Sequence, residues 1–187
     1  MKNIDETILI NRSLNSDSQA FAQLVDLHKA MVFNIVIKIL RKREEAEECA
    51  QDVFIKVYQS LNTFKHKAKF STWLYRIAFN MAISRNRKKS IETTELNEDI
   101  YRNITEDEIY SNFEKQNIEE QCKIIDKAIE ALPAEDAVII TLFYLDEKSV
   151  EELAFIMGLT KSNIKVKLHR ARKKLYVMLS KTFVIID

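Results

Sequence analysis

The chain has 187 residues, of which 47% are hydrophobic and 30% are charged, so it can form one large or two small folded domains and is too apolar to be disordered. One glycine and one proline leave little material for the tight turns of a β-rich fold, and the composition therefore predicts an all-α protein. The two cysteines, Cys49 and Cys122, form no CxxC pair, which argues against a zinc site or a disulfide framework. Both are expected to be small buried residues.

The net charge of +1 conceals an uneven distribution along the chain. Residues 1–90 carry 16 basic and 9 acidic side chains, residues 91–121 carry 2 and 10, and residues 122–187 carry 11 and 9. Residues 160–181 contain 8 basic side chains and no acidic one. The sequence thus predicts two basic faces separated by an acidic segment. No secretory pattern or membrane-spanning apolar stretch is apparent, so we expect a cytoplasmic protein without membrane insertion.

Apolar residues between positions 16 and 61 recur every three or four residues, which predicts helices throughout, with a break at the charged residues 41–45. The second of these helices has a predicted buried stripe formed by Cys49, Val53, Val57 and Leu61, with Ala46, Phe54 and Tyr58 beside it.

A polar loop at 62–69 precedes a helix that Ser71 or Thr72 would cap and that extends to about Lys88. The expected buried face of this helix comprises Trp73, Leu74, Ile77, Ala78 and Met81. Residues 91–121 are acidic and lack regular apolar spacing, so we interpret them as a linker.

The last third of the chain is predicted to form four helices. The first begins near Cys122 and buries Cys122, Ile125, Ile129 and Leu132, and the second begins at Pro133 and extends to about Leu145. Ser149 and Glu152 form a capping box for a short third helix, and Gly158 follows it as a left-handed turn residue. Thr160 caps the last helix, whose buried face is Ile164, Leu168, Ala171 and Leu175.

A short helix, a glycine turn and a basic helix are the layout of a helix-turn-helix, whose second helix enters the major groove of DNA. Projecting residues 161–175 as a helix gives an outer face opposite the buried stripe. This face and its flanks supply the candidate DNA-binding residues Ser162, Asn163, Lys165, Val166, His169, Arg170, Arg172 and Lys173. The early residues are candidates to read bases, with Val166 suited to a thymine methyl group, whereas the later cations, including Lys174, are candidates to hold phosphates. The alternative is a solvated basic helix within a bundle.

Two blocks of sequence resemble the extracytoplasmic-function (ECF) family of RNA polymerase sigma factors. The stretch SVEELAFIMGLTKSNIKVKLHRAR at 149–172, preceded by ALP at 131–133, is similar to the fourth region of these proteins. The stretches AEECAQDVF at 46–54 and FSTWLYRIAFN at 70–80 are similar to their second region. Ser84, Asn163 and Val166 depart from residues common in the family, so the resemblance does not transfer a particular promoter sequence.

The resemblance implies that residues 1–90 bind core RNA polymerase and melt the minus-ten element, that 91–121 are a linker, and that 122–187 bind the minus-thirty-five element. The polymerase-docking residues would be Gln51, Asp52, Phe54, Ile55 and Tyr58. For Phe54 and Tyr58 the alternative is simple packing against the preceding helix. The minus-ten residues would be Lys65, Lys67, Lys69, Tyr75, Arg76, Phe79, Asn80 and Arg87.

The residue types in this segment favour the minus-ten assignment independently of the resemblance. Tyr75, Phe79 and Ile83 are expected to lie off the buried stripe, among cations that include Arg85, and exposed aromatic faces with cations suit an unstacked single strand. For Trp73 we expect core packing.

The sequence therefore predicts a sigma factor whose partners are core RNA polymerase and promoter DNA. It contains no nucleophile with an adjacent base, no metal cluster and no phosphate-cradling loop, so we expect no enzymatic activity, cofactor or metal. The rival functions are a conventional helix-turn-helix regulator acting without polymerase and a helical interaction protein with no DNA role. Whether an anti-sigma factor binds the chain stays open, as does the role of the apolar C-terminal tail.

Overall fold

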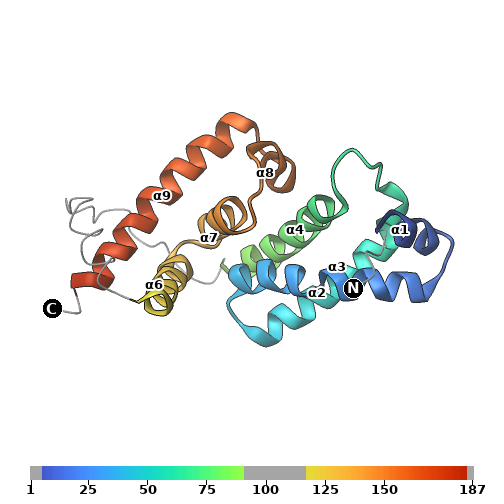
Figure 1. Cartoon of the computed structure of the whole chain (residues 1–187), viewed down its shortest axis with the longest axis horizontal. Coiled ribbons are helices and arrows are strands. Elements are labelled where there is room, and N and C mark those ends of the chain that lie inside the picture. Colours follow the sequence, from blue (N-terminus) through green and yellow to red (C-terminus); the bar gives the residue numbers. More distant parts are fainter. Residues whose placement is uncertain (1–5, 91–116, 185–187) are drawn as a thin grey trace. The chain divides into compact units, whose positions relative to one another are not determined.

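The computed structural model describes residues 6–90 and 117–184, and it divides the chain into two compact units. The first unit contains the helices up to Lys88 together with Phe155–Gly158, and the second contains the rest of the helices that follow residue 117. Among the described residues every regular element is a helix, which confirms the all-α prediction (Figure 1). Most of the predicted linker, and the end of the C-terminal tail, lie outside the described residues.

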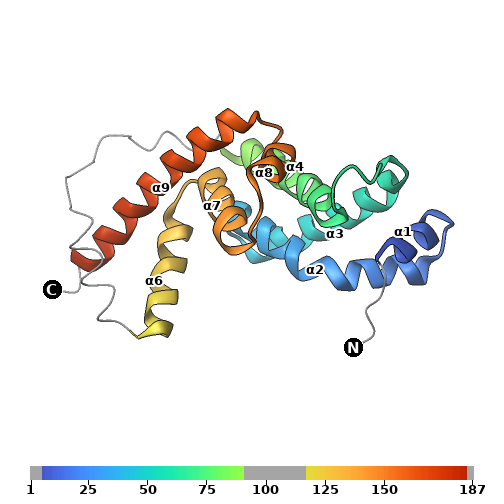
Figure 2. The same ribbon diagram turned by 45° about the horizontal axis from the view of Figure 1, so that its top comes forward.

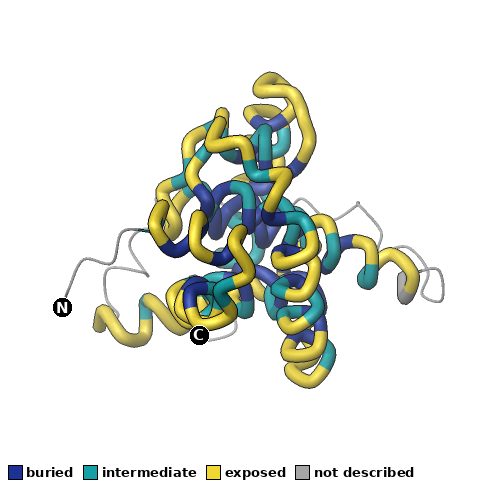
Figure 3. Tube along the Cα trace, turned by 90° about the vertical axis from the view of Figure 1, so that its right-hand side faces the viewer, coloured by how far each residue is buried: buried dark blue, intermediate teal, exposed yellow. Residues whose placement is uncertain are grey.

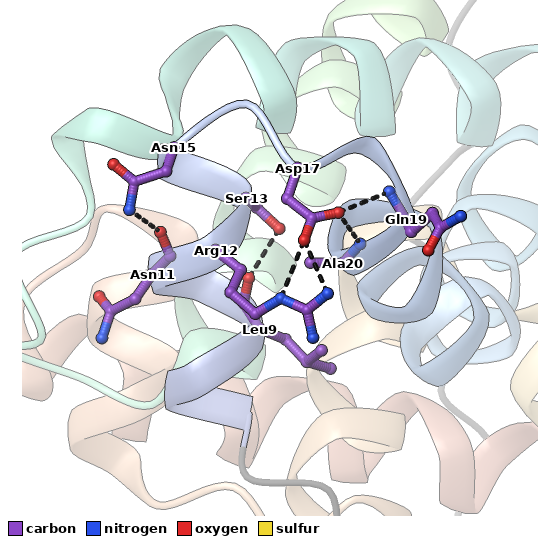
Figure 4. A network of polar contacts seen from close by, with 8 residues as sticks. All are labelled: Leu9, Asn11, Arg12, Ser13, Asn15, Asp17, Gln19 and Ala20. Carbon is purple, nitrogen blue, oxygen red and sulfur yellow. Dashed lines mark hydrogen bonds and ion pairs between the residues drawn. The ribbon is translucent and has the colours of Figure 1, made fainter.

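The first unit begins with α1 (Glu6–Leu14), a helix that the sequence analysis did not predict, followed by α2 (Ser18–Leu40). The turn between them is closed by Asp17, whose carboxylate accepts hydrogen bonds from the backbone amides of Gln19 and Ala20 and from Arg12 (Figure 4). The backbone hydrogen bond from Ala20 and the bond from Arg12 lower the pKa of the Asp17 carboxyl group. Capping of this kind fixes where α2 starts.

Packing between α1 and α2 buries Leu9 and Ile10, and the two helices lie side by side in both views of the ribbon (Figures 1 and 2). His28 Nε2 of α2 lies 2.6 Å from Glu6 Oε1 of α1 and adds a polar contact between the two helices. Because α1 covers an apolar side of α2, it is part of the core of this unit.

Arg41, in the left-handed conformation with φ 62°, ends α2, and α3 (Arg43–Ser60) follows at the predicted charged break. The predicted stripe is confirmed, because Cys49, Val53, Val57 and Leu61 are buried, and Ala46 beside it is buried too. Burial also raises the pKa of the Cys49 thiol. One 3₁₀ turn, η1 (Leu61–Thr63), leads into the loop before the next helix.

The helix α4 (Phe70–Ser90) begins before the predicted caps, so Ser71 and Thr72 lie in its first turn. Its buried face also differs from the prediction, because it comprises Phe70, Leu74, Tyr75, Ala78, Phe79, Ala82 and Ile83. Trp73, Ile77 and Met81 are only half-buried. The physical reason is that apolar residues occur on all sides of this helix between 73 and 83, so their spacing alone selects no face.

By length and composition, α2 is the one helix among the described residues that could cross a membrane, and 28% of its most apolar window is buried in the structure. Its apolar residues Leu24, Val32, Ile35, Val36, Ile39 and Leu40 are buried in the core of the first unit. A core helix of a folded unit accounts for this composition.

The second unit starts with α6 (Ile118–Ala131), which begins four residues before the predicted position at Cys122. A capping box fixes this start, since Asn117 accepts from the amide of Glu120 and Glu120 accepts from the amide of Asn117. The buried residues are Ile124, Ala128 and Ile129. The prediction that Cys122 is buried was wrong: it is exposed, because the buried face of α6 starts two positions later.

Three further helices follow α6. They are α7 (Ala134–Ile140), which continues into one π-helical turn, η2 (Thr141–Leu145), then α8 (Val150–Met157) and α9 (Lys161–Val184). Pro133 is the N-cap of α7, so this helix begins one position later than predicted. Both α6 and α7 pack against α9, and in the burial view buried residues lie where helices face one another (Figure 3).

Candidate nucleic-acid interface

The segment from α8 to α9 has the local geometry of a helix-turn-helix. Ser149 Oγ accepts a hydrogen bond from the Glu152 amide, and the Glu152 carboxylate accepts one from the Ser149 amide, so the predicted capping box is present. Gly158 has φ +68°, the left-handed conformation expected for the turn. Thr160 Oγ1 accepts from the Asn163 amide at 3.2 Å and caps α9 as predicted.

The inner face of α9 is the predicted one, because Ile164, Leu168 and Ala171 are buried and Leu175 is half-buried. All eight predicted residues of the outer face and flanks are exposed: Ser162, Asn163, Lys165, Val166, His169, Arg170, Arg172 and Lys173. Val166 is 50% exposed although it is apolar. A helix with cations and an exposed apolar residue on one side offers phosphate contacts together with a contact for a thymine methyl group.

Ion pairs separate some of the basic residues of α9 from the rest. Lys174, which the sequence analysis assigned to phosphates, instead contacts the buried carboxylate of Asp136 in α7 at 2.8 Å. Lys167 contacts Glu135 at 2.8 Å, and Lys161 contacts Glu151 in α8 at 2.6 Å. The bond from Lys161 lowers the pKa of the Glu151 carboxyl group.

In the first unit, the loop between η1 and α4 carries the exposed lysines predicted for the minus-ten surface, Lys65, Lys67 and Lys69. The loop also holds His66, exposed and left-handed with φ 54°. The ring of His66 lies 4.5 Å from that of Phe64, which in turn lies 5.4 Å from the ring of Trp73. Sequence reasoning missed His66 because a single histidine in a polar loop carries no periodic signal, although its position among three lysines was visible.

The prediction that Tyr75 and Phe79 lie off the buried stripe was wrong, since they are 4% and 5% exposed, and Ile83 is also buried. The exposed residues on the described part of α4 are instead Asn80, Ser84, Arg87 and Lys88, while Arg76 is half-buried. Near the loop lysines, aromatic surface is therefore offered by the exposed ring of His66 and in part by the half-buried rings of Phe64 and Trp73.

The predicted polymerase-docking residues lie on α3 with different exposures. Gln51, Ile55 and Tyr58 are exposed, with Ile55 at 55% and Tyr58 at 49%, whereas Asp52 and Phe54 are half-buried. Tyr58 also contacts Phe21 of α2, with ring centroids 4.9 Å apart in an edge-to-face geometry. The Tyr58 side chain therefore packs against α2 and is also about half exposed.

Asp52 and Arg85, which the sequence analysis placed on different surfaces, form an ion pair that links α3 to α4. Arg85 also lies 3.4 Å from Glu48. Arg85 is therefore engaged within the first unit, and the cations on the exposed side of α4 are other residues.

Comparisons with known proteins agree with this geometry. Residues 24–91 match sigma-70 region 2, and residues 122–175 match sigma-70 region 4. The chain is 33% identical over 174 residues to the ECF RNA polymerase sigma factor SigW of Bacillus subtilis (strain 168), a match that covers 89% of this chain and 92% of that protein. It is 29% identical over 176 residues to the ECF RNA polymerase sigma-E factor of Escherichia coli (strain K12), with coverages of 91% and 92%.

Two solved structures share the fold. One is CnrH in complex with the cytosolic domain of CnrY, with 21% identity, a TM-score of 0.63 and coverages of 93% and 96%. The other is the sigma factor RpoE with the anti-sigma factor NepR from Bartonella quintana, with 23% identity, a TM-score of 0.62 and coverages of 86% and 96%. Together with the matched regions and the helix-turn-helix, these findings lead to one conclusion: the chain belongs to the ECF family of RNA polymerase sigma factors, which bind core polymerase and direct promoter-specific initiation.

Proposed function

We propose that the two matched regions of the chain divide promoter recognition between them. Residues 122–187 bind the minus-thirty-five element as duplex, and residues 1–90 bind the minus-ten element and core polymerase. The observation that carries the first assignment is the exposure of all eight outer residues of α9 beside a capped glycine turn. A conventional regulator of the same fold class would usually pair two copies on half-sites, whereas this chain carries unlike basic surfaces on its two parts.

Within α9, Lys165 and Val166 set specificity, and Arg172 and Lys173 set affinity. The reason is position: residues near the start of a recognition helix reach base edges, and later cations lie along the phosphates. The test measures holoenzyme binding of Lys165→Ala and Arg172→Ala to a series of minus-thirty-five variants. Removal of a side chain that reads a base costs about 1–3 kcal/mol on one sequence, whereas removal of one that holds a phosphate weakens binding on all sequences. The assignment fails where Arg172→Ala alone changes the order of preference.

The minus-ten surface consists of the loop lysines, the ring of His66 on its Phe64 support, and Asn80 with Arg87 on α4. Exposed rings beside cations are suited to hold an unstacked single strand, and Asn80 can donate to a base or a phosphate. This surface replaces the predicted one built on Tyr75 and Phe79, whose rings are buried. Capture of a base that has left the stack would make melting selective for sequence.

Polymerase docking is assigned to the outer side of α3, where Ile55 and Tyr58 expose apolar surface beside Gln51. Large apolar and aromatic side chains of this kind supply most of the binding energy of an interface. Asp52 also belongs to this proposed set, and its carboxylate pairs with Arg85.

The protein acts by binding, without catalysis or a resident cofactor, and it works in the cytoplasm. An anti-sigma factor is a further proposed partner, because one solved structure of the same fold is a complex with the anti-sigma factor NepR. Co-purification of the tagged chain with core RNA polymerase and transcription from a captured promoter test the central proposal. Failure to copurify with polymerase would leave a duplex-binding regulator as the better description.

A further inference from the structure

Two lysines on one flank of α9 are held by two adjacent acids of α7. Lys167 Nζ lies 2.8 Å from Glu135 Oε2, and Lys174 Nζ lies 2.8 Å from Asp136 Oδ2. The lysines are seven residues apart, which is about two helical turns, so both project from the same side of α9. The acids follow each other in the first turn of α7. The two ion pairs therefore join the same two helices at points two turns apart along α9.

These four side chains are more enclosed than surface ion pairs usually are. The exposed fractions are 26% for Lys167, 35% for Glu135, 30% for Lys174 and only 9% for Asp136. Partly buried charges are screened less by salt than exposed ones, and an almost buried carboxylate requires a partner. By contrast, the exposed pair between Lys161 and Glu151, at 62% and 61%, is of the kind that contributes little.

The basic residues on the outside of α9 differ in this respect. Within the ranges that the structure describes, no salt bridge engages Lys165, Arg170, Arg172 or Lys173, and all four are exposed. Among the described cations of α9, Lys167 and Lys174 are thus committed to α7 and Lys161 pairs with α8, whereas these four are available to a ligand. Sequence alone does not separate the groups, because all of these residues are equally basic.

We propose that Lys167 and Lys174 are positioning residues, which Glu135 and Asp136 hold so that the rotation of α9 about its own axis is fixed against α7. They do not bind DNA phosphates. The inference rests on the proposed function of α9 as the recognition helix. Rotation matters because side chains early in a recognition helix must meet particular base edges. A small rotation of the helix misaligns these side chains with the bases. Phosphate contacts made by long flexible cations persist.

The test compares two double variants that remove the same amount of charge in holoenzyme. One is Lys167→Met with Lys174→Met, and the matched control is Arg172→Met with Lys173→Met. Two quantities are measured: the slope of log affinity against log salt, and the ratio of affinities for the minus-thirty-five element and for single-base-pair variants of it. In a parent protein a mismatched pair lowers affinity by roughly 5- to 150-fold.

We expect the Lys167/Lys174 variant to keep the salt slope of the parent and to lose much of the discrimination. The control should lower the slope by about 0.9 for each phosphate that the variant no longer neutralises, and it should keep the discrimination. A fall in slope for the Lys167/Lys174 variant equal to that of the control would overturn the inference, because those lysines would then bind phosphates. Unchanged discrimination in that variant would overturn it too. If the control leaves the slope unchanged, the proposed role of α9 itself fails.

Loss of folding is separated from loss of positioning by two single variants. Lys174→Arg retains a cation opposite Asp136 and should keep the discrimination, whereas Asp136→Asn removes the charged partner and should lower it. A merely structural pair would change the melting temperature of Asp136→Asn and leave the affinity ratio of the folded fraction at its parent value. An unchanged affinity ratio in Asp136→Asn would therefore count against a positioning role.

Discussion

Burial of Phe79 and exposure of His66 predict opposite consequences for two substitutions in the first unit. Phe79 is 5% exposed on the inner side of α4, so Phe79→Ala removes a ring from the core. Substitutions of this type cost about 3–5 kcal/mol of the free energy of unfolding. His66 lies on the loop, exposed and in a left-handed backbone conformation. His66→Asn removes the ring while keeping a residue that tolerates this conformation, so its effect on stability should be small.

Promoter opening should be impaired by His66→Asn and not by Phe79→Ala. If His66 stacks on an unpaired base, its loss removes about 1–3 kcal/mol from the open complex, which is roughly a 5- to 150-fold smaller opening equilibrium. Phe79→Ala, measured under conditions where the variant stays folded, should open the promoter normally. Asn62→Ala, in the neighbouring 3₁₀ turn, is the matched control because Asn62 is exposed and carries no ring.

The assay is permanganate footprinting of thymines in holoenzyme complexes, on a duplex promoter and on a template already mismatched at the minus-ten element. The mismatched template should partly rescue His66→Asn, because the cost of unpairing has been removed. Urea unfolding of the free protein provides the stability values. The reasoning is refuted if Phe79→Ala unfolds like the parent but opens poorly, or if His66→Asn opens the duplex promoter as well as the parent does.

Three other predictions follow from exposure and backbone geometry. Gly158→Ala should lose about 1–2 kcal/mol of stability from left-handed strain alone, because a Cβ added there meets nothing within 4 Å. Gly158→Asn should lose less, and equal losses for the two variants in urea unfolding would contradict this. Iodoacetamide should label exposed Cys122 in the native protein and spare Cys49, whose burial raises the thiol pKa, until the chain is unfolded; mass spectrometry after short exposure decides. Ile55→Ala with Tyr58→Ala should weaken capture of core polymerase by a folded protein, and unchanged capture would remove α3 from the proposed docking surface.

The face of α9 was predictable from sequence because its apolar and basic residues separate cleanly around the helix. Ile164, Leu168 and Ala171 lie at spacings of four and three with polar residues between them, and one projection describes both sides. The caps at Ser149 and Thr160 were equally predictable, since capping depends on neighbours within three residues. Local chemistry sufficed for this part of the site.

The face of α4 was not predictable in this way. Apolar residues fill most positions from Trp73 to Ile83, so neighbouring helices decide which of them are enclosed. The same limit applies to ion pairs such as Lys174 with Asp136, which join residues 38 positions apart. In the sequence Lys174 is one of several cations of the last helix, and only tertiary packing determines that it faces α7.

The helix α1 has a practical consequence for the preparation of isolated fragments. The match to sigma-70 region 2 starts at residue 24, inside α2, and a fragment cut there would lose Leu9, Ile10 and the cap at Asp17. It would also uncover an apolar strip of α2, and contiguous apolar surface of that kind promotes aggregation. A fragment intended for magnetic resonance spectroscopy should therefore begin ahead of Glu6, where an affinity tag can be attached without disturbing the contact between Glu6 and His28.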